Sequence, residues 1–189
     1  MSAPLQLAVL VASTREGRFA DTISNWFVHH ACRREDLRVD VVDLAEARLP
    51  ATLTPRPTPE VERFAARLDD ADAFVVITPE YNHSFPAPLK QAIDLTASEW
   101  HAKPVGFVSY GGISGGLRAV EQLRPVFAEH HAVTVRETVS FHRAWARFDA
   151  HGQPMQPEGP NSAAKRLLDQ LTWWARALRD ARAERPYAA

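Results

Sequence analysis

The stretch AFVVITPEYNHSFPAPLKQA, residues 73–92, decides the fold that this sequence predicts. It begins with a run of apolar residues typical of a buried β-strand, predicted at Ala73–Thr78. A polar turn with an acid, a phenol, an amide and an imidazole follows, and a helix is predicted over Pro86–Ile93. Open α/β sheets bind ligands beside the carboxyl ends of their strands. This strand, loop and helix therefore predict an α/β protein with a ligand site at the loop.

The rest of the chain alternates apolar strands with helical patterns. Four more strands are predicted, at Leu5–Val11, Val39–Leu44, Lys103–Tyr110 and Val133–Val139. Helices are predicted from about Phe19, over Glu60–Leu68 after a Thr58 cap and Pro59, over Leu117–His130 and over Ser162–Arg185, with irregular segments at Ala47–Pro59 and Phe141–Pro160. Alternation of this kind predicts a doubly wound five-stranded parallel sheet in a three-layer α/β/α arrangement, with the flavodoxin-like strand order. We expect residues 1–189 to form a single domain.

Composition and charge exclude several classes of protein. The 189 residues are 46% hydrophobic and 24% charged, which is typical of a globular protein. With a formal net charge of -1, the chain has no overall positive electrostatic potential that would attract nucleic acid or an anionic membrane. The single cysteine, Cys32, excludes an intramolecular disulfide and a cysteine-built metal cluster, and we expect it to be a buried structural thiol. No run approaches the ~20 apolar residues of a membrane span. We expect a cytoplasmic protein.

The polar loop after the first strand has the composition of an anion site. Unpaired backbone N–H groups and the dipole at a helix start favour an anion. Ser13 and Thr14 add hydroxyl donors, and Gly17 permits unusual backbone angles. Arg15 and Arg18 add charged donors. Since the loop lacks both the dinucleotide fingerprint and the end of a P-loop, we interpret it as a phosphate-monoester site. An ordinary capped helix start with solvated arginines is the alternative.

The polar turn after the third strand is better suited to recognition than to catalysis. Glu80 and His83 are too few to ligate a metal, and Ser84 is not in a nucleophile-elbow motif. Asn82 and the backbone can read the edge of a planar heterocycle while Tyr81 covers its face. A proline-bounded turn with exposed polar residues is the alternative interpretation.

The third distinctive loop, Ser109–Gly116, is rich in glycine. Glycine lets the main chain approach a flat ligand closely, although a flexible turn has the same composition. The three loops follow strands one, three and four, which are neighbours in the flavodoxin-like order. We therefore expect them to converge on one edge of the sheet and to form a single site.

These motifs together resemble a known family. Thr78–Asp94, TPEYNHSFPAPLKQAID, resembles the signature of the NADPH-dependent FMN reductase family, which comprises flavodoxin-like quinone, azo-dye and chromate reductases. The Ser-Thr-Arg-x-Gly-Arg loop and the Tyr-Gly-Gly loop resemble the family's other two segments in order and spacing. The resemblance covers Leu5 to Leu178, nearly the whole chain.

The resemblance implies a set of FMN contacts and an assembly. The implied contacts are Ser13, Thr14, Arg15, Gly17, Arg18, Phe19 and Ala20 at the phosphate, Pro79, Glu80, Tyr81 and Asn82 along the isoalloxazine, and Ser109, Tyr110, Gly111 and Gly112 at its pyrimidine side. It also implies a homodimer, sometimes a homotetramer, with the flavin near the subunit boundary. Phe141–Pro160 matches no functional motif. It is either a surface excursion or a segment that shapes the substrate pocket.

We therefore expect a flavin oxidoreductase that passes hydride from NADPH or NADH through FMN to a small-molecule acceptor such as a quinone, an azo compound or free flavin. Because the cofactor supplies the chemistry, no side chain is predicted to be catalytic, and no metal is expected. Arg15 and Arg18 can alternatively meet the 2′-phosphate of NADPH. A flavodoxin-type electron carrier is a second hypothesis, which the net charge of -1 disfavours. A flavin-binding partner or sensor without turnover is a third.

Overall fold

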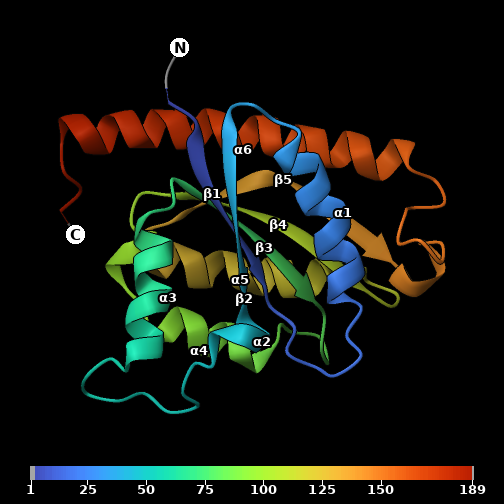
Figure 1. Ribbon diagram of the computed structural model, residues 1–189, viewed down its shortest axis with the longest axis horizontal. Coiled ribbons are helices and arrows are strands. Elements are labelled where there is room, and N and C mark those ends of the chain that lie inside the picture. The colour runs from blue at the N-terminus through green and yellow to red at the C-terminus, as the bar shows by residue number, and fades with distance from the viewer. Residues whose placement is uncertain (1–2, 189) are drawn as a thin grey trace.

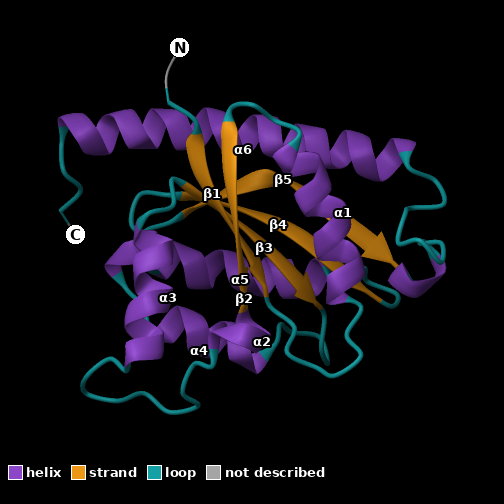
Figure 2. Ribbon diagram, in the orientation of Figure 1, coloured by secondary structure: helices purple, strands orange, loops and turns teal. Residues whose placement is uncertain are grey.

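Residues 3–188 are described by a computed structural model, in which helices cover both faces of a parallel sheet (Figures 1 and 2). The strands are β1 (Leu5–Val11), β2 (Leu37–Asp43), β3 (Ala73–Pro79), β4 (Pro104–Gly111) and β5 (Val133–His142). Their spatial order is β2-β1-β3-β4-β5, and every neighbouring pair is parallel. This is the flavodoxin-like order, so the predicted fold class is confirmed.

The helices form two layers around the sheet. They are α1 (Ala20–Cys32), α2 (Leu44–Ala47), α3 (Pro59–Asp69), α4 (Ala87–Asp94), α5 (Leu117–Glu129) and α6 (Glu158–Glu184), with short 3-10 turns η1 (Ser98–Trp100) and η2 (Ala144–Ala146). Side chains of α1 and α6 share one apolar cluster with one face of the sheet. Those of α3, α4 and α5 share a second cluster with the other face. All residues of β3 and β4 are consequently buried, as expected of central strands covered on both sides.

The strand predicted at Val39–Leu44 differs from the structure at both ends. β2 begins at Leu37, two residues earlier than predicted, and Leu44 belongs to α2 instead of the strand. The Asp43 side chain accepts a hydrogen bond from the backbone N–H of Ala45 at 2.9 Å and caps this short helix. The cap of α3 is as predicted, since Thr58 Oγ1 accepts from the N–H of Val61 at 3.4 Å.

The segment predicted as irregular over Phe141–Pro160 is shorter in the structure. β5 continues to His142 because it still pairs with β4 up to Gly111. α6 begins at Glu158, so Pro160 lies in its first turn. The backbone N–H groups of a first turn have no intrahelical partner, and proline therefore costs little there.

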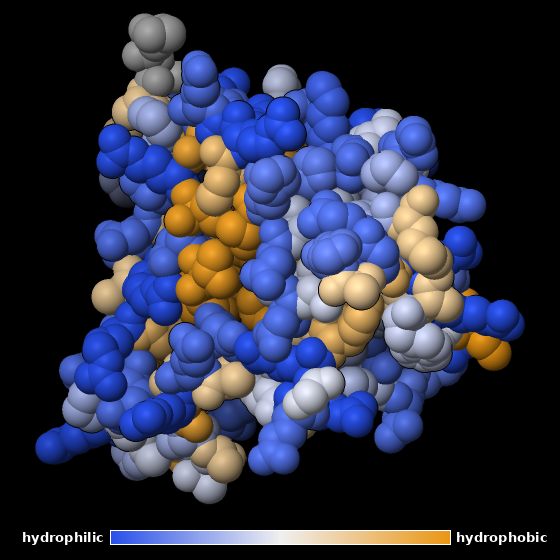
Figure 3. Space-filling view, turned by 45° about the vertical axis from the view of Figure 1, so that its right-hand side comes forward, coloured by the Kyte–Doolittle hydropathy of each residue, from blue (hydrophilic) through white to orange (hydrophobic). Residues whose placement is uncertain are grey.

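Two surface features complete the fold. Cys32 is exposed at the end of α1, so the expectation of a buried thiol is wrong. Figure 3 shows an apolar area over the edge of the sheet near β2, where Val41 is 40% exposed. Charged side chains interrupt this edge, including the ion pair of Asp40 with Arg67, which is one way in which proteins prevent edge strands from pairing with other chains. Within residues 3–188, no helix is both long and apolar enough to cross a bilayer.

A buried lysine joins β4 to α3. Lys103 is 5% exposed, and its ammonium donates to the carbonyl oxygens of Leu68 at 2.9 Å and Asp69 at 2.8 Å. Both carbonyls lie at the carboxyl end of α3, where the regular helical hydrogen bonds stop, and the Leu68 carbonyl also accepts from the Ala71 N–H at 3.2 Å, so the lysine helps to cap the helix. Desolvation lowers the pKa of Lys103 from 10.5 to about 8.

The lowered pKa of Lys103 predicts a pH dependence of stability. Between pH 8 and 10.5 the unfolded chain holds the lysine proton more tightly than the folded chain does, so stability rises with pH. We expect a gain of about 2 kcal/mol between pH 8 and 10. Above that range the buried Tyr110 opposes the gain, because burial raises the pKa of its phenol. Urea unfolding at each pH measures the slope. Lys103→Met should remove it, and an unchanged slope in that variant would contradict the assignment to Lys103.

Candidate cofactor site

The loops that follow β1, β3 and β4 meet at one edge of the sheet, on the lower right of Figure 1. Ser13 Oγ lies 2.8 Å from the hydroxyl of Tyr81, which joins the first loop to the second. The carboxylate of Glu80 accepts from the hydroxyl of Ser114, which joins the second loop to the third. Three loops distant in sequence thus form one hydrogen-bonded unit, and the predicted convergence is confirmed.

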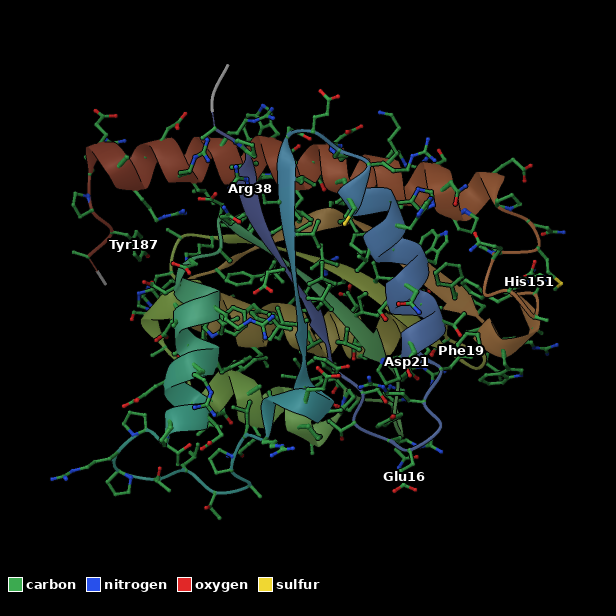
Figure 4. The ribbon with its side chains drawn as sticks, viewed as in Figure 1. Glu16, Phe19, Asp21, Arg38, His151 and Tyr187 are labelled. Atoms are coloured by element: carbon green, nitrogen blue, oxygen red, sulfur yellow. The ribbon has the colours of Figure 1, made fainter. Side chains whose placement is uncertain are left out.

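The first loop presents backbone donors without partners. Within residues 3–188, no hydrogen bond uses the backbone N–H groups of Thr14, Arg15, Glu16 or Gly17. Phe19 is the N-cap of α1 and provides no side-chain cap, so the first helical N–H groups are also available. Glu16 points outward from the tip of the loop (Figure 4). The loop therefore combines open N–H groups with a helix dipole, which is the composition of an anion site.

The two arginines of this loop have different environments. Arg15 is exposed, and its guanidinium carbon lies 5.7 Å from the centre of the Tyr81 ring. Arg18 is only 13% exposed and makes a bidentate pair with Asp43, a second pair with Asp21 and a 2.6 Å hydrogen bond to the Ser13 carbonyl. The Asp43 hydrogen bond raises the pKa of Arg18 above its ordinary value. Arg15 is therefore available to an anion, whereas Arg18 is occupied in shaping the loop.

The second loop is a rigid turn. Tyr81 and Ser84 exchange two backbone hydrogen bonds, of 2.8 and 3.0 Å. The residues between them, Asn82 and His83, both have positive φ, at 48° and 73°. These features define a type I′ turn, in which asparagine is favoured and histidine is strained. Gln122 of α5 donates to the His83 carbonyl at 2.8 Å and accepts from Ser84 Oγ at 2.5 Å, which holds the turn in place. No pattern near Gln122 in the sequence marks this role.

The side chain of Glu80 points to α5. It is 8% exposed and accepts hydrogen bonds from the Arg118 backbone N–H and guanidinium, both at 3.2 Å, in addition to the Ser114 hydroxyl. Since α5 begins at Leu117, this carboxylate lies at the positive end of the helix. The side chain of Glu80 thus ties two loops together, and its backbone N–H donates to the Tyr110 carbonyl at 3.0 Å, so only its backbone carbonyl remains available to a ring.

The third loop is shaped by close packing at its second pair of glycines. Gly115 and Gly116 have φ of 62° and 86°, and a Cβ on Gly116 would lie 2.6 Å from Ser109 Cβ and 2.8 Å from the backbone nitrogen of Tyr110. The hydroxyls of Ser109 and Ser140 both donate to the Gly115 carbonyl, at 2.9 and 2.8 Å. Ser109 is fully buried, so its side chain fixes the loop and does not line an open site.

Tyr110 is also a packing residue. Its side chain is 6% exposed and lies beside Phe19, with ring centres 6.4 Å apart. Gly111 and Gly112 follow it without side chains, and a Cβ on Gly112 would approach the ring of Trp145 at 3.8 Å. Trp145 is 66% exposed and comes from η2, in the segment that matched no motif. The sequence offers no signal for this contact, because the chain between the two residues contains a helix and a strand.

The predicted contacts therefore separate into two groups. The hydroxyl of Ser13, the guanidinium of Arg15 and the phenol of Tyr81 lie together, and the backbones of Gly111 and Gly112 end the neighbouring strand. Thr14 is exposed in the first loop, so its hydroxyl is open to a ligand. The other predicted residues support the site through packing, backbone geometry or hydrogen bonds: Gly17, Arg18, Phe19, Ala20, Pro79, Glu80, Asn82, Ser109 and Tyr110. No group of three His, Cys, Asp or Glu side chains within the described part of the chain is arranged to hold a metal.

This arrangement fits a flat ligand that carries a phosphate. Open N–H groups, the exposed hydroxyl of Thr14 and the exposed guanidinium of Arg15 suit a phosphate dianion, whereas Ser13 is 1% exposed and its hydroxyl is paired with Tyr81. The fixed turn at Asn82 and the glycines at the end of β4 suit a planar ring, because both present backbone polar groups in rigid positions. FMN has both parts, and the residues present fit it.

Comparisons with known proteins agree with this assignment. A family described as NADPH-dependent FMN reductase matches residues 5–146. An NAD(P)H-dependent FMN reductase of Schizosaccharomyces pombe is 33% identical over 122 residues, which are 59% of this chain and 60% of that protein. A 2-hydroxy-1,4-benzoquinone reductase of a Burkholderia species is 29% identical over 180 residues, covering 91% of this chain and 97% of that protein.

A solved structure has the same fold. FerB, a flavoenzyme NAD(P)H:(acceptor) oxidoreductase from Paracoccus denitrificans, superposes with a TM-score of 0.73 at 21% identity, over 91% of this chain and 98% of that one. The chain spans less than two thirds of the length of the fission-yeast relative, at 60%, but nearly the whole length of FerB.

Proposed function

The chain belongs to the NADPH-dependent FMN reductase family, and we propose that it binds FMN and uses NADPH or NADH to reduce a small-molecule acceptor such as a quinone, an azo compound or free flavin. The observation that carries this proposal is the meeting of three loops at one sheet edge, one with open N–H groups and two with fixed backbones. We propose that residues 1–189 act as one domain in doing so.

Binding and orientation are the work of the protein in this proposal. The loop before α1 would hold the phosphate through backbone N–H groups, the exposed Thr14 hydroxyl and Arg15. The isoalloxazine ring would be held by Tyr81, Asn82 and the glycines at the end of β4, whose positions the fold already fixes. When bound, FMN supplies the two-electron hydride chemistry. Backbone donors fixed beside the ring would stabilise negative charge on its reduced form, so no side chain is required as an acid or base.

Arg15→Ala tests the phosphate assignment. The substitution removes one charge-assisted donor, so FMN affinity should fall about 10–100-fold. Riboflavin lacks the phosphate, and its affinity should change less than threefold by the same argument. Quenching of flavin fluorescence measures both constants. Equal losses for FMN and riboflavin would contradict a phosphate contact by Arg15.

We propose that Trp145 lines the acceptor position, because its ring lies against Gly112 at the end of β4 while two thirds of the residue remains exposed. Stacking on an aromatic acceptor is worth about 0.5–1.5 kcal/mol, so Trp145→Ala should raise KM for a quinone about 3–10-fold. FMN affinity and KM for ferricyanide, which has no ring to stack, should stay unchanged. Trp173→Ala is the matched control, since Trp173 is 63% exposed on α6. The same rise in both variants would oppose the proposal.

Turnover separates the proposal from its alternatives. Purified protein with FMN should oxidise NADPH continuously when a quinone is the sole acceptor, and the two substrates should give parallel double-reciprocal lines, since each reacts at the same place in turn. A flavodoxin-type carrier would need a protein partner, and a sensor would not turn over. We also propose that the protein is a cytoplasmic homodimer or homotetramer. Analytical ultracentrifugation would measure its oligomeric state.

A further inference from the structure

Helix α5 holds the second loop at both of its ends. The amide of Gln122 donates to the His83 carbonyl at 2.8 Å and accepts from Ser84 Oγ at 2.5 Å. One helical turn earlier, the backbone and the guanidinium of Arg118 donate to the carboxylate of Glu80. Residues four apart lie on the same face of a helix, so both contacts come from one side of α5. The conformation of this loop is therefore fixed by a separate element of the fold.

The Gln122 amide is the contact that acts on the turn itself. A carbonyl oxygen can only accept, so the amide nitrogen must face His83, and the amide oxygen then accepts from Ser84. Both polar ends of the side chain are used in this way, although Gln122 is exposed to solvent. The side chain thus spans two consecutive residues of the turn and restrains both.

The turn needs this restraint because its own sequence does not favour it throughout. Type I′ turns require positive φ at both central residues, and Asn-Gly is among the sequences that suit them best. The second central residue here is His83, with a φ of 73°. A residue with a side chain is strained in this conformation and persists in it only where the surrounding structure holds it. The Gln122 contacts therefore compensate for the absence of a glycine.

The restrained turn presents two open backbone donors. Tyr81 and Ser84 use their N–H groups within the turn, whereas no hydrogen bond among the described residues uses the N–H groups of Asn82 or His83. Successive N–H groups in a turn form a concave site that favours negative charge. The turn follows β3 at the edge of the sheet where the three loops meet, so these donors belong to the part of the site assigned to the flavin ring.

We propose that Gln122 is a positioning residue that sets the reduction potential of bound FMN, by holding the N–H groups of Asn82 and His83 beside the flavin ring. The proposal rests on the proposed function, since it concerns the flavin site of that reaction. The flavin ring carries more negative charge after it has taken up two electrons. Donors fixed beside the ring therefore bind the reduced form more tightly than the oxidised form, which raises the midpoint potential.

Gln122→Met is the central variant. Methionine keeps the length and the helix propensity of glutamine at this exposed position and removes both hydrogen bonds, so α5 should remain folded. Affinity for reduced FMN should fall about tenfold relative to affinity for oxidised FMN, which lowers the two-electron midpoint potential by about 30 mV. Anaerobic titration with dithionite beside a reference dye measures the midpoint, and quenching of flavin fluorescence measures the affinity for oxidised FMN.

A second substitution tests whether Gln122 acts through the turn. His83→Gly gives the turn a central pair that adopts the type I′ conformation without strain. In the double variant His83→Gly/Gln122→Met, the relative affinity for reduced FMN should therefore stay within about twofold of its value in His83→Gly alone. If Gln122→Met lowers the midpoint equally with and without His83→Gly, Gln122 does not act through the turn and the proposal is wrong.

Two further variants complete the test. Ser84→Ala removes one of the two Gln122 hydrogen bonds and should lower the midpoint by less than Gln122→Met does. Gln156→Ala changes an exposed glutamine outside the loop and should leave the midpoint unchanged. An unchanged midpoint in Gln122→Met would overturn the proposal. Equal losses of affinity for oxidised and reduced FMN would also overturn it, because they would indicate a general loosening of the site.

The outcomes also distinguish this proposal from the proposed function. Dithionite reduces bound flavin without a nicotinamide, so the midpoint is measured whether or not NADPH is a donor. If dithionite reduces FMN in the parent protein and NADPH does not, the reductase activity is wrong and the midpoints still decide the role of Gln122. If NADPH reduces the flavin and Gln122→Met leaves the midpoint unchanged, the reductase stands and the role of Gln122 is wrong.

Discussion

Replacing Gly116 by alanine is expected to lower the free energy of unfolding by about 2–5 kcal/mol. The new Cβ would lie 2.6 Å from Ser109 Cβ and 2.8 Å from the Tyr110 nitrogen, and both neighbours are buried in β4. The φ of 86° adds strain for any side chain. Because the end of β4 must move, FMN binding should also be lost. Urea unfolding of the flavin-free protein and flavin-fluorescence titration measure the two effects.

Substitutions at two other glycines distinguish the cost of a positive φ from the cost of a steric clash. Gly17 has a φ of 60° with no atom within 4 Å of a Cβ, so Gly17→Ala should cost only about 1 kcal/mol. Gly159 lies in α6 with open space around it, and Gly159→Ala should stabilise the protein by about 0.5–1 kcal/mol. If Gly116→Ala cost no more than Gly17→Ala, the close packing described at this loop would be contradicted.

Arg18→Ala is expected to have the second largest effect. It removes the partner of Asp43, whose side chain is 15% exposed, and the donor to the Ser13 carbonyl. Leaving a mostly buried carboxylate unpaired should cost about 2–3 kcal/mol of stability. Since Arg18 shapes the loop, affinity for FMN and for riboflavin should fall by similar factors. This pattern is opposite to the one expected for Arg15, whose guanidinium has no carboxylate partner within residues 3–188.

A double-mutant cycle tests the Arg18 pair. Asp43→Ala also removes the cap of α2, so it should be destabilising alone. The double variant Arg18→Ala/Asp43→Ala should lose about 1–3 kcal/mol less stability than the sum of the two single variants, because both charges of the pair are removed together. Additive costs would show that the pair does not couple the loop to β2. If Arg18→Ala lowered the affinity for FMN much more than the affinity for riboflavin, Arg18 would have to contact the phosphate directly.

The fold follows largely from hydrophobic patterning. β3 and β4 are buried along their whole length, and uninterrupted apolar runs predict them within one residue at each end. The edge strands β2 and β5 differ more from their predicted bounds, because their burial patterns are mixed and their ends depend on pairing with a neighbouring strand. Pro160 led the prediction to begin α6 four residues late, because proline interrupts helices everywhere except near their first turn.

The site was predictable in its position but not in the role of each side chain. Polar loops after strands one, three and four indicate where a ligand binds, since strand order fixes which loops meet. Whether Glu80 faces a ring or caps α5 depends on Ser114 and Arg118, more than thirty residues away. Arg15 and Arg18 look alike in the sequence, and the bidentate pair that withdraws Arg18 from a ligand is made with Asp43 on β2, twenty-five residues away. Long-range partners of this kind leave no local pattern.

Anaerobic reduction of the FMN-loaded protein by NADPH tests the central claim most directly. The purified chain should bind FMN, show the visible absorbance of oxidised flavin, and lose it within seconds of mixing with NADPH or NADH. Added quinone should then restore the oxidised spectrum in proportion to the quinone supplied. A bound flavin whose spectrum neither nicotinamide changes would contradict the assignment of this protein as a reductase, and a chain that binds no FMN would contradict the site itself.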